Sequence, residues 1–273
     1  MPGVEPSGFN PKPAPTVSTP SSPTTTSPLI PPDPTVPVRQ LFKTIVHVTV
    51  GPSKIVFPVH RELLCAASTF FTAALNPRHG FLESVTSTVH LPEARPAIFE
   101  YFVQWLYTRS LGHEDLDGQE QPAYFRLIGL YALADMLGVE GCKNDVCDKV
   151  GRLAEERNCV VNPDDTRMLW GEVREGAGLR VLVLDLFAFK KTGRLVETHE
   201  DSWDERFLRD LVARLKTTKG WEGGSRFAPW RSPAAMCEKY HEHADGVVCF
   251  PVKPLEETTA ARRRRRNRAE VGG

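Results

Sequence analysis

The spacing of apolar residues changes early in the chain, and this change most limits the folds that the chain can adopt. Residues 44–50 are mostly β-branched, residues 51–53 form a Gly-Pro-Ser turn signal, and residues 54–59 carry apolar side chains at alternate positions. This pattern predicts a β-hairpin. Over residues 61–75, apolar residues instead recur every three or four positions before Pro77, which predicts one amphipathic helix. Strands followed by helices favour an α+β domain.

Apolar periodicity continues over most of the remaining chain. Thr88–Leu91 is predicted to be a short strand. One helix is expected to begin at Pro96. Further helices are expected at Ala123–Leu137, Val139–Leu153, Asp164–Val173, Leu179–Lys190 and Ser202–Lys216. We therefore expect a small sheet that starts with a hairpin, flanked by a helical cluster and followed by a helical extension.

Both ends of the chain differ in composition from the middle. Residues 1–38 contain 12 of the 23 prolines and 11 serines or threonines but only three charged residues, so they cannot bury enough apolar surface to offset their ordering entropy. We predict a disordered Pro/Ser/Thr-rich tail there. Arg262 to Arg266 together with Arg268 form a basic run, which fits either a nuclear import signal or a solvated tail.

The charge balance and the apolar segments argue against two classes of partner. Lys plus Arg and Asp plus Glu both number 34, and no aromatic residue interleaves with the arginine run, so sequence-specific nucleic-acid binding is not expected. No apolar run approaches the ~18 residues of a membrane span, and no secretory signal is visible. We therefore expect a protein of the cytoplasm, the nucleus or both, with reduced cysteines and no membrane contact.

Four motifs occur in an order that resembles a known family. They are Phe57-Pro58-Val59-His60-Arg61-Glu62-Leu63-Leu64, Ser68-Thr69-Phe70-Phe71, the segment from Phe99 to Thr108, and Tyr131-Ala132-Leu133-Ala134-Asp135. Together they resemble the BTB/POZ family, and the long helical region after them resembles the BTB proteins of filamentous fungi. The resemblance implies a BTB/POZ domain at 40–157. The apolar pattern and the composition then predict a helical extension at 158–220, and a loop, a Cys/His cluster and the basic tail at 221–273.

The resemblance also implies that the chain binds other proteins. BTB domains self-associate or bind partners, and many recruit a cullin scaffold for ubiquitin transfer through a hydrophobic-x-Glu motif that follows the first helical region. Phe81-Leu82-Glu83 fits this motif, so Phe81 and Glu83 are the candidate cullin contacts, with the alternative that Phe81 only covers the core. A homodimer is a further alternative. Lys43-Thr44 stands where the family often has an aspartate, and a Pro-rich tail stands where dimeric members have a helix and a swapped strand, which argues against the usual form.

A Cys/His cluster near the end of the chain is the candidate metal site. Cys237, His241, His243 and Cys249 supply the thiolate and imidazole ligands that suit a tetrahedral zinc ion. Four protein ligands would make the site structural, because a catalytic zinc keeps one position open for water. The spacing differs from that of a standard zinc finger, so an exposed His-rich segment with two ordinary cysteines is the alternative.

The chain carries none of the common enzyme motifs, neither a GxxxxGK[ST] phosphate-binding loop nor an HExxH or GxSxG sequence. We therefore expect a non-enzymatic protein-interaction module, with a substrate adaptor for a cullin ubiquitin ligase as the leading interpretation and no cofactor beyond a structural zinc. A nuclear scaffold or transcription co-regulator that self-associates through its BTB domain is the first alternative. A zinc-dependent enzyme at the C-terminal cluster is the second.

Overall fold

The computed structural model describes residues 42–112, 124–190, 192–217, 228–243 and 249. The predicted disordered tail at 1–38 and the basic run at 262–268 lie outside the described residues. None of the described helices is both long enough and apolar enough to span a bilayer.

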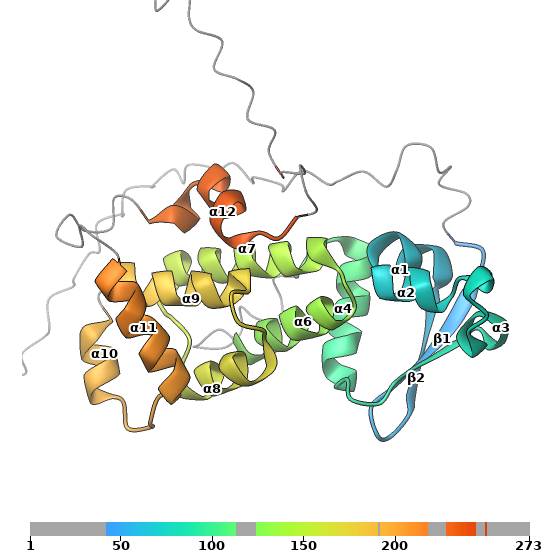
Figure 1. Cartoon of the computed structure of the whole chain (residues 1–273), viewed down its shortest axis with the longest axis horizontal. Coiled ribbons are helices and arrows are strands. Elements are labelled where there is room, and N and C mark those ends of the chain that lie inside the picture. Colours follow the sequence, from blue (N-terminus) through green and yellow to red (C-terminus); the bar gives the residue numbers. More distant parts are fainter. Residues whose placement is uncertain (1–41, 113–123, 191, 218–227, 244–248, 250–273) are drawn as a thin grey trace, which may run out of the picture. The chain divides into compact units, whose positions relative to one another are not determined.

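The sheet has three strands in the order β2-β1-β3 (Figure 1). β1 (Ile45–Val50) and β2 (Ile55–His60) pair antiparallel, with Val48 opposite Phe57, so the predicted hairpin is confirmed. β3 (Thr88–Leu91) lies parallel to β1 on its other side. A parallel neighbour requires a crossover connection, and the short helices between the strands supply it. Alternate valines of β1 are fully buried, so one face of the sheet packs into the core.

The first helical segment is interrupted, so the prediction of one long helix there is wrong. α1 (Arg61–Ala67) ends at Ser68, whose backbone is extended, and α2 (Thr69–Ala74) begins directly after it. The Ser68 hydroxyl accepts a hydrogen bond from the Phe71 amide and donates one of 2.6 Å to the Leu137 carbonyl. A serine that competes for backbone groups favours a helix cap over a helix interior. The break therefore ties the first helices to the end of a later one.

Three long helices connect the sheet to the rest of the protein (Figure 1). They are α4 (Pro96–Thr108), α6 (Tyr124–Met136) and α7 (Glu140–Glu156), which agree with the predicted positions to within one turn. α4 packs against α6, and α6 packs against α7. The buried face of α4 consists of Ile98, Phe99, Phe102, Trp105 and Leu106. Full burial of each such side chain stabilises the fold by roughly 1.5–3 kcal/mol, so this face anchors the helical cluster.

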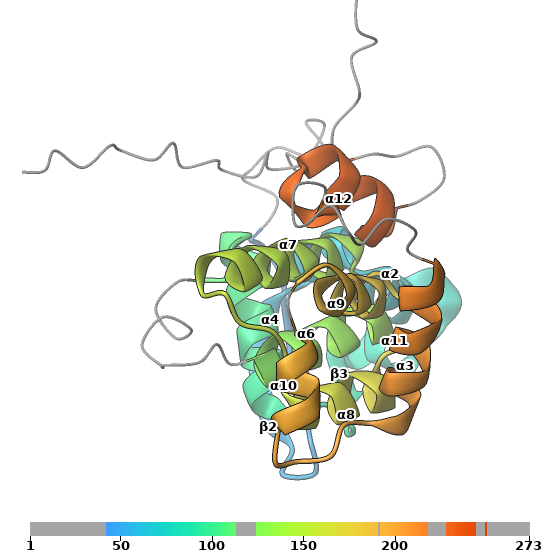
Figure 2. The ribbon, with the colours of Figure 1, turned by 90° about the vertical axis from the view of Figure 1, so that its left-hand side faces the viewer.

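Five α-helices of the described residues follow residue 157. They are α8 (Pro163–Glu172), α9 (Gly178–Phe189), α10 (Gly193–Thr198), α11 (Glu205–Thr217) and α12 (Pro233–Tyr240). α8, α9 and α12 pack onto α6 or α7, and α11 packs onto α8 and α9. α8 contacts α6 and α9 contacts α7, so the buried apolar side chains form one continuous cluster from the sheet to α12. Figure 2 shows α12 lying over α7 and α9. The sequence pattern predicts α8, α9 and α11 but not the two shorter helices.

A buried carboxyl group lies at the start of α8. The Asn162 side chain accepts a hydrogen bond from the Asp165 amide at 2.8 Å, and Asp165 Oδ2 accepts one from the Asn162 amide at 3.1 Å, which forms a capping box. Asp165 is only 6% exposed, and burial together with the charge of Asp164 raises its pKa to about 6. Ionisation of Asp165 is therefore more costly in the folded protein than in the unfolded chain.

We predict that Asp165→Asn stabilises the protein at neutral pH. Aspartate in an unfolded chain has a pKa of about 3.9, so between about pH 4 and pH 6 the folded protein holds a proton that the unfolded chain releases. The stability contributed by this group is present below about pH 4 and is lost as the pH rises through about 6. An amide keeps the hydrogen bond without the charge, so the variant should gain about 1–3 kcal/mol at about pH 7.5 and little at about pH 4.5, measured by urea unfolding.

Asp201→Asn serves as the control, because the Asp201 side chain is 66% exposed. It should change the free energy of unfolding by less than about 0.5 kcal/mol at either pH. An Asp165→Asn variant less stable than wild type at neutral pH would contradict the prediction.

Candidate functional site

The candidate cullin contacts lie on a short helix beside the sheet. α3 (Leu82–Thr86) begins directly after Phe81, and Glu83 lies in its first turn. Phe81, Leu82 and Val85 are 50%, 72% and 79% exposed, whereas Glu83 is half-buried. Half of the Phe81 side chain faces solvent, so this residue is accessible to a partner. We call Phe81, Leu82, Glu83 and Val85 the α3 surface, which places three apolar side chains beside one carboxylate.

A shallow groove lies next to the α3 surface. The break between α1 and α2 lines it with small side chains such as Cys65, Ser68 and Thr72, and His79 lines it as well. The groove has a volume of about 280 Å³. The rings of His79 and Phe81 meet edge-on with their centroids 6.0 Å apart. Through His79, the groove and the α3 surface are therefore continuous.

The structure brings the four predicted metal ligands together. Cys237 lies on α12, His241 directly follows that helix, and His243 and Cys249 come from the segment after it. One ligand atom from each residue lies within 4.8 Å of those of the other three. Cys237 Sγ is 3.2 Å from His243 Nε2. Cys249 Sγ is 3.2 Å from His241 Nδ1 and 3.3 Å from His243 Nε2. The four side chains therefore lie together and partly buried, rather than spread along an exposed segment.

Two polar contacts orient the cluster. Asp148 Oδ1 of α7 is 3.0 Å from His241 Nε2, and the His241 side chain is only 2% exposed. The Cys249 amide donates a hydrogen bond to Cys237 Sγ at 3.4 Å. Burial and the neighbouring Cys237 thiol raise the pKa of Cys249 to about 12, so without a cation Cys249 is a neutral thiol. Sequence reasoning misses Asp148, because one aspartate among the charged residues of α7 carries no signal of its own.

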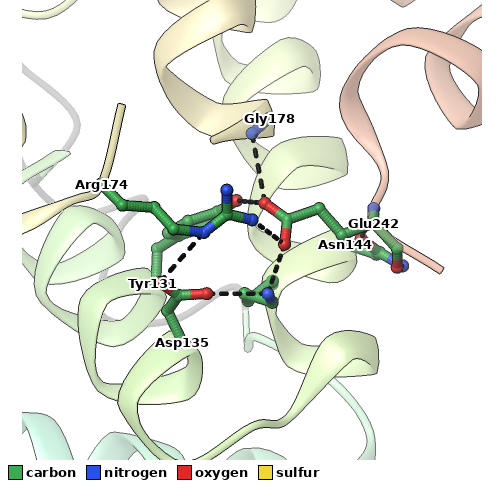
Figure 3. A network of polar contacts seen from close by, with 7 residues as sticks. Tyr131, Asp135, Asn144, Arg174, Gly178 and Glu242 are labelled. Atoms are coloured by element: carbon green, nitrogen blue, oxygen red, sulfur yellow. Dashed lines mark hydrogen bonds and ion pairs between the residues drawn. The ribbon is translucent and has the colours of Figure 1, made fainter. Parts of the chain in front are cut away.

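Glu242, between the two histidines, points into a network of polar groups from α6, α7 and α9 (Figure 3). Its Oε1 accepts hydrogen bonds from the Tyr131 hydroxyl at 2.7 Å and from the Gly178 amide at 3.3 Å. Its Oε2 lies 2.5 Å from both Lys143 Nζ and a terminal nitrogen of Arg174. One carboxylate from the C-terminal segment therefore joins three other parts of the chain.

The network holds Glu242 in its charged form. Burial alone would raise the pKa of Glu242, but hydrogen bonds from Lys143 and Tyr131 and the charge of Lys143 outweigh burial and lower the pKa to about 2. The amide and carbonyl of Glu242 also pair with the Asn144 side chain at 2.9 and 3.0 Å. Sequence reasoning misses Glu242 too, although its place between two candidate ligands could have indicated it. Because alternate residues of an extended segment point to opposite sides, a residue between two ligands faces away from them.

The comparison with protein families agrees with this architecture. A family model of the BTB/POZ domain matches residues 40–150. Residues 40–150 of the chain therefore form a BTB/POZ domain. The three-stranded sheet with its hairpin start and the flanking helices confirm the expected BTB/POZ fold, and α8 to α12 form the helical part that follows it. No curated protein matches the chain. BTB/POZ domains are interaction modules, so protein binding is the activity that the family supports.

The matched BTB/POZ domain contains the α3 surface and also Asp148 and Lys143 of α7, whereas the four candidate metal ligands lie beyond it.

The C-terminal segment around Tyr240 lies directly against α9 at Gly178. A Cβ atom on Gly178 would overlap with the Tyr240 carbonyl oxygen, so a larger residue does not fit there. Because α9 begins at Gly178, the Glu242 carboxylate also lies where the helix dipole favours an anion.

We predict that Gly178→Ala displaces the segment around Tyr240 from the start of α9 in this BTB/POZ domain protein. The added methyl group requires movement of the backbone, which should weaken the contacts of Glu242 and lower the free energy of unfolding by about 1–3 kcal/mol. Urea unfolding measures the loss, and hydrogen exchange at α12 locates it. Gly171→Ala in α8 is the matched control, because nothing lies within 4 Å of its Cβ position. This control should be neutral or stabilising by up to about 1 kcal/mol, and equal losses in the two variants would contradict the prediction.

Proposed function

We propose that this BTB/POZ domain protein is a non-catalytic docking protein that binds a cullin-type scaffold through its α3 surface. The observation that carries the proposal is the exposure of Phe81, Leu82 and Val85 beside the half-buried Glu83. A few large apolar side chains at the centre of an interface supply most of its binding energy, and a neighbouring charge adds orientation. The sequence Phe81-Leu82-Glu83 also resembles the hydrophobic-x-Glu motif of cullin-binding BTB domains.

The groove beside the α3 surface supports the same proposal. It is lined by the break between α1 and α2, where the extended backbone of Ser68 interrupts the helical surface. A partner helix or loop that buries Phe81 can extend across His79 into this groove, because the two rings are in contact. The docking area would then combine an apolar centre with a rim of serine, threonine and histidine side chains, which is the usual anatomy of a protein interface.

The helices beyond the BTB/POZ domain are the proposed binding region for a substrate. α11 buries Phe207 and Leu211 but leaves Val212 and Leu215 at 52% and 46% exposure, and Leu195 of α10 is 37% exposed. Val212 and Leu215 belong to the apolar face that the sequence predicts for α11. A substrate bound there would be held by the same folded unit that holds the scaffold.

Self-association is a second candidate function, because the hairpin exposes apolar residues of its own. Phe42, Ile45, Ile55 and Val56 are between 40% and 54% exposed. A second copy of the chain that covers these residues would make the protein a scaffold or co-regulator, with or without import into the nucleus. A zinc-dependent enzyme is the least supported candidate, because all four candidate ligands are protein groups and a catalytic zinc needs an open position.

We predict that Phe81→Ala combined with Glu83→Ala weakens binding to a purified cullin scaffold at least about 30-fold, since loss of a central anchor costs about 2 kcal/mol or more. Binding is measured by titration and pull-down with the full chain. Phe125→Ala with Glu93→Ala is the matched control, because Phe125 is 51% exposed on α6 and Glu93 is exposed elsewhere. The control variant should bind like wild type.

Light scattering on the same samples separates the two candidate functions. A monomer that binds the scaffold through the α3 surface supports the adaptor. If wild type and both variants fail to bind while remaining folded, the adaptor proposal is rejected, and a dimeric mass would then favour self-association through the hairpin.

A further inference from the structure

The distances in the Cys/His cluster fit a tetrahedral metal ion. With zinc–sulfur bonds of about 2.3 Å and zinc–nitrogen bonds of about 2.0–2.1 Å, neighbouring ligand atoms in a tetrahedron lie about 3.3–3.8 Å apart. The three sulfur–nitrogen distances in the cluster are 3.2, 3.2 and 3.3 Å, at or just below this range, and the four atoms all lie within 4.8 Å of one another, so small side-chain shifts would complete a tetrahedron. The set of two thiols and two imidazoles is one that zinc prefers.

We propose that Cys237, His241, His243 and Cys249 bind one structural zinc ion, and that this zinc ion holds Glu242 in its polar network and so clasps the C-terminal segment onto the BTB/POZ domain. Neither part of this inference follows from the docking function. It rests on the cluster and on the alternation of side chains at residues 241–243.

The surroundings of the cluster are those of a metal site. A metal-bound histidine usually pairs its other ring nitrogen with a carboxylate, which fixes the ring and its tautomer. Asp148 occupies this position against His241, with a distance of 3.0 Å to Nε2, while Nδ1 faces the cluster. The Cys249 amide, 3.4 Å from Cys237 Sγ, is placed to stabilise a thiolate. Asp148 is thus a positioning residue that joins the site to α7.

Two other uses of these residues fit less well. A disulfide between Cys237 and Cys249 would leave both histidines facing sulfur atoms without a role. A nucleophilic relay from Asp148 through His241 to Cys249 would need open space at the Cys249 sulfur. His243 Nε2 lies 3.3 Å from that sulfur, and the Cys249 amide is hydrogen-bonded to Cys237 Sγ. A zinc ion uses all four groups at once.

The backbone of residues 241–243 couples the metal site to Glu242. α12 ends at Tyr240, and His241 adopts extended backbone angles of −83° and 150°. In an extended segment, His241 and His243 point to one side and Glu242 points to the other. The residues on one side are the zinc ligands, and the residue on the other side reaches Tyr131, Lys143, Arg174 and the Gly178 amide (Figure 3). Zinc binding therefore selects the backbone conformation in which Glu242 can reach its partners.

The first experiment measures metal in the full chain purified without added zinc. We expect one zinc per chain by elemental analysis, and replacement by Co²⁺ should give the visible spectrum of a tetrahedral site with two thiolates. Cys237→Ser and Cys249→Ser should abolish this spectrum. Cys65→Ser and Cys159→Ser, which alter two half-buried cysteines outside the cluster, should leave it unchanged.

A second variant keeps the proposal testable if the cysteine variants do not fold. Asp148→Asn retains all four ligands, and we expect it to weaken zinc affinity about 10–100-fold in competition with a chromophoric chelator. Glu242→Gln should keep the Co²⁺ spectrum, because the residue is not a ligand. Absence of stoichiometric zinc and of Co²⁺ binding, or a Cys237–Cys249 disulfide found by mass spectrometry, overturns the zinc site.

Hydrogen exchange tests the coupling separately. Removal of zinc with a chelator should increase exchange at the Gly178 amide, which donates to Glu242, and at residues 240–243, while the β1–β2 amides stay protected. Zinc returned to the sample should restore the protection. If zinc is bound but its removal leaves the Gly178 amide unchanged, the clasp is rejected. Cullin binding is read in the same samples, so failure of the docking proposal and failure of the clasp remain distinguishable.

Discussion

Helix α7 is enclosed by other parts of the protein, so its polar side chains must find partners outside the helix. Lys143, Asn144 and Lys149 are each only 6% exposed. A buried ion without a partner costs several kcal/mol, and a buried amide without one costs less but still destabilises the fold. The partners come from distant segments: Trp105 for Asp145, Glu242 for Lys143 and Asn144, His241 for Asp148, and Trp230 for Glu155. The need of these α7 side chains for polar partners thus determines where the distant segments must lie.

The short segment around Glu242 supplies partners for two polar side chains of α7, one from each side of its extended backbone. Its histidines face Asp148 and the cysteines, and its carboxylate faces Lys143. The BTB/POZ domain, the helices behind it and the C-terminal segment consequently share one core. In the docking function proposed above, this continuity would keep a partner at the α3 surface and another at α11 at a fixed separation.

The sequence is sufficient for the elements whose signal is periodic. The hairpin, the strand β3 and the long helices follow from apolar spacing, and the BTB/POZ resemblance follows from motifs within them. The break at Ser68 is not predicted, because the apolar spacing continues across it and the deciding contact is with Leu137, far along the chain. The candidate metal ligands could be found by residue type, but Asp148 could not, and for Glu242 the only signal is its place between two candidate ligands. Charged residues on a helix or beside a histidine are usually solvated, and only the packing of distant segments shows that these are not.

The contacts of Glu242 also have a consequence for the order of folding. They join residues separated by 111 positions from Tyr131 and 99 from Lys143. Closing such long loops is entropically costly and slow compared with forming the hairpin or a single helix. During synthesis on the ribosome, Lys143 emerges well before Glu242, and of its two carboxylate partners in the described residues only Asp135 is then available. The nascent BTB/POZ domain therefore lacks one carboxylate partner of Lys143 until Glu242 has been synthesised.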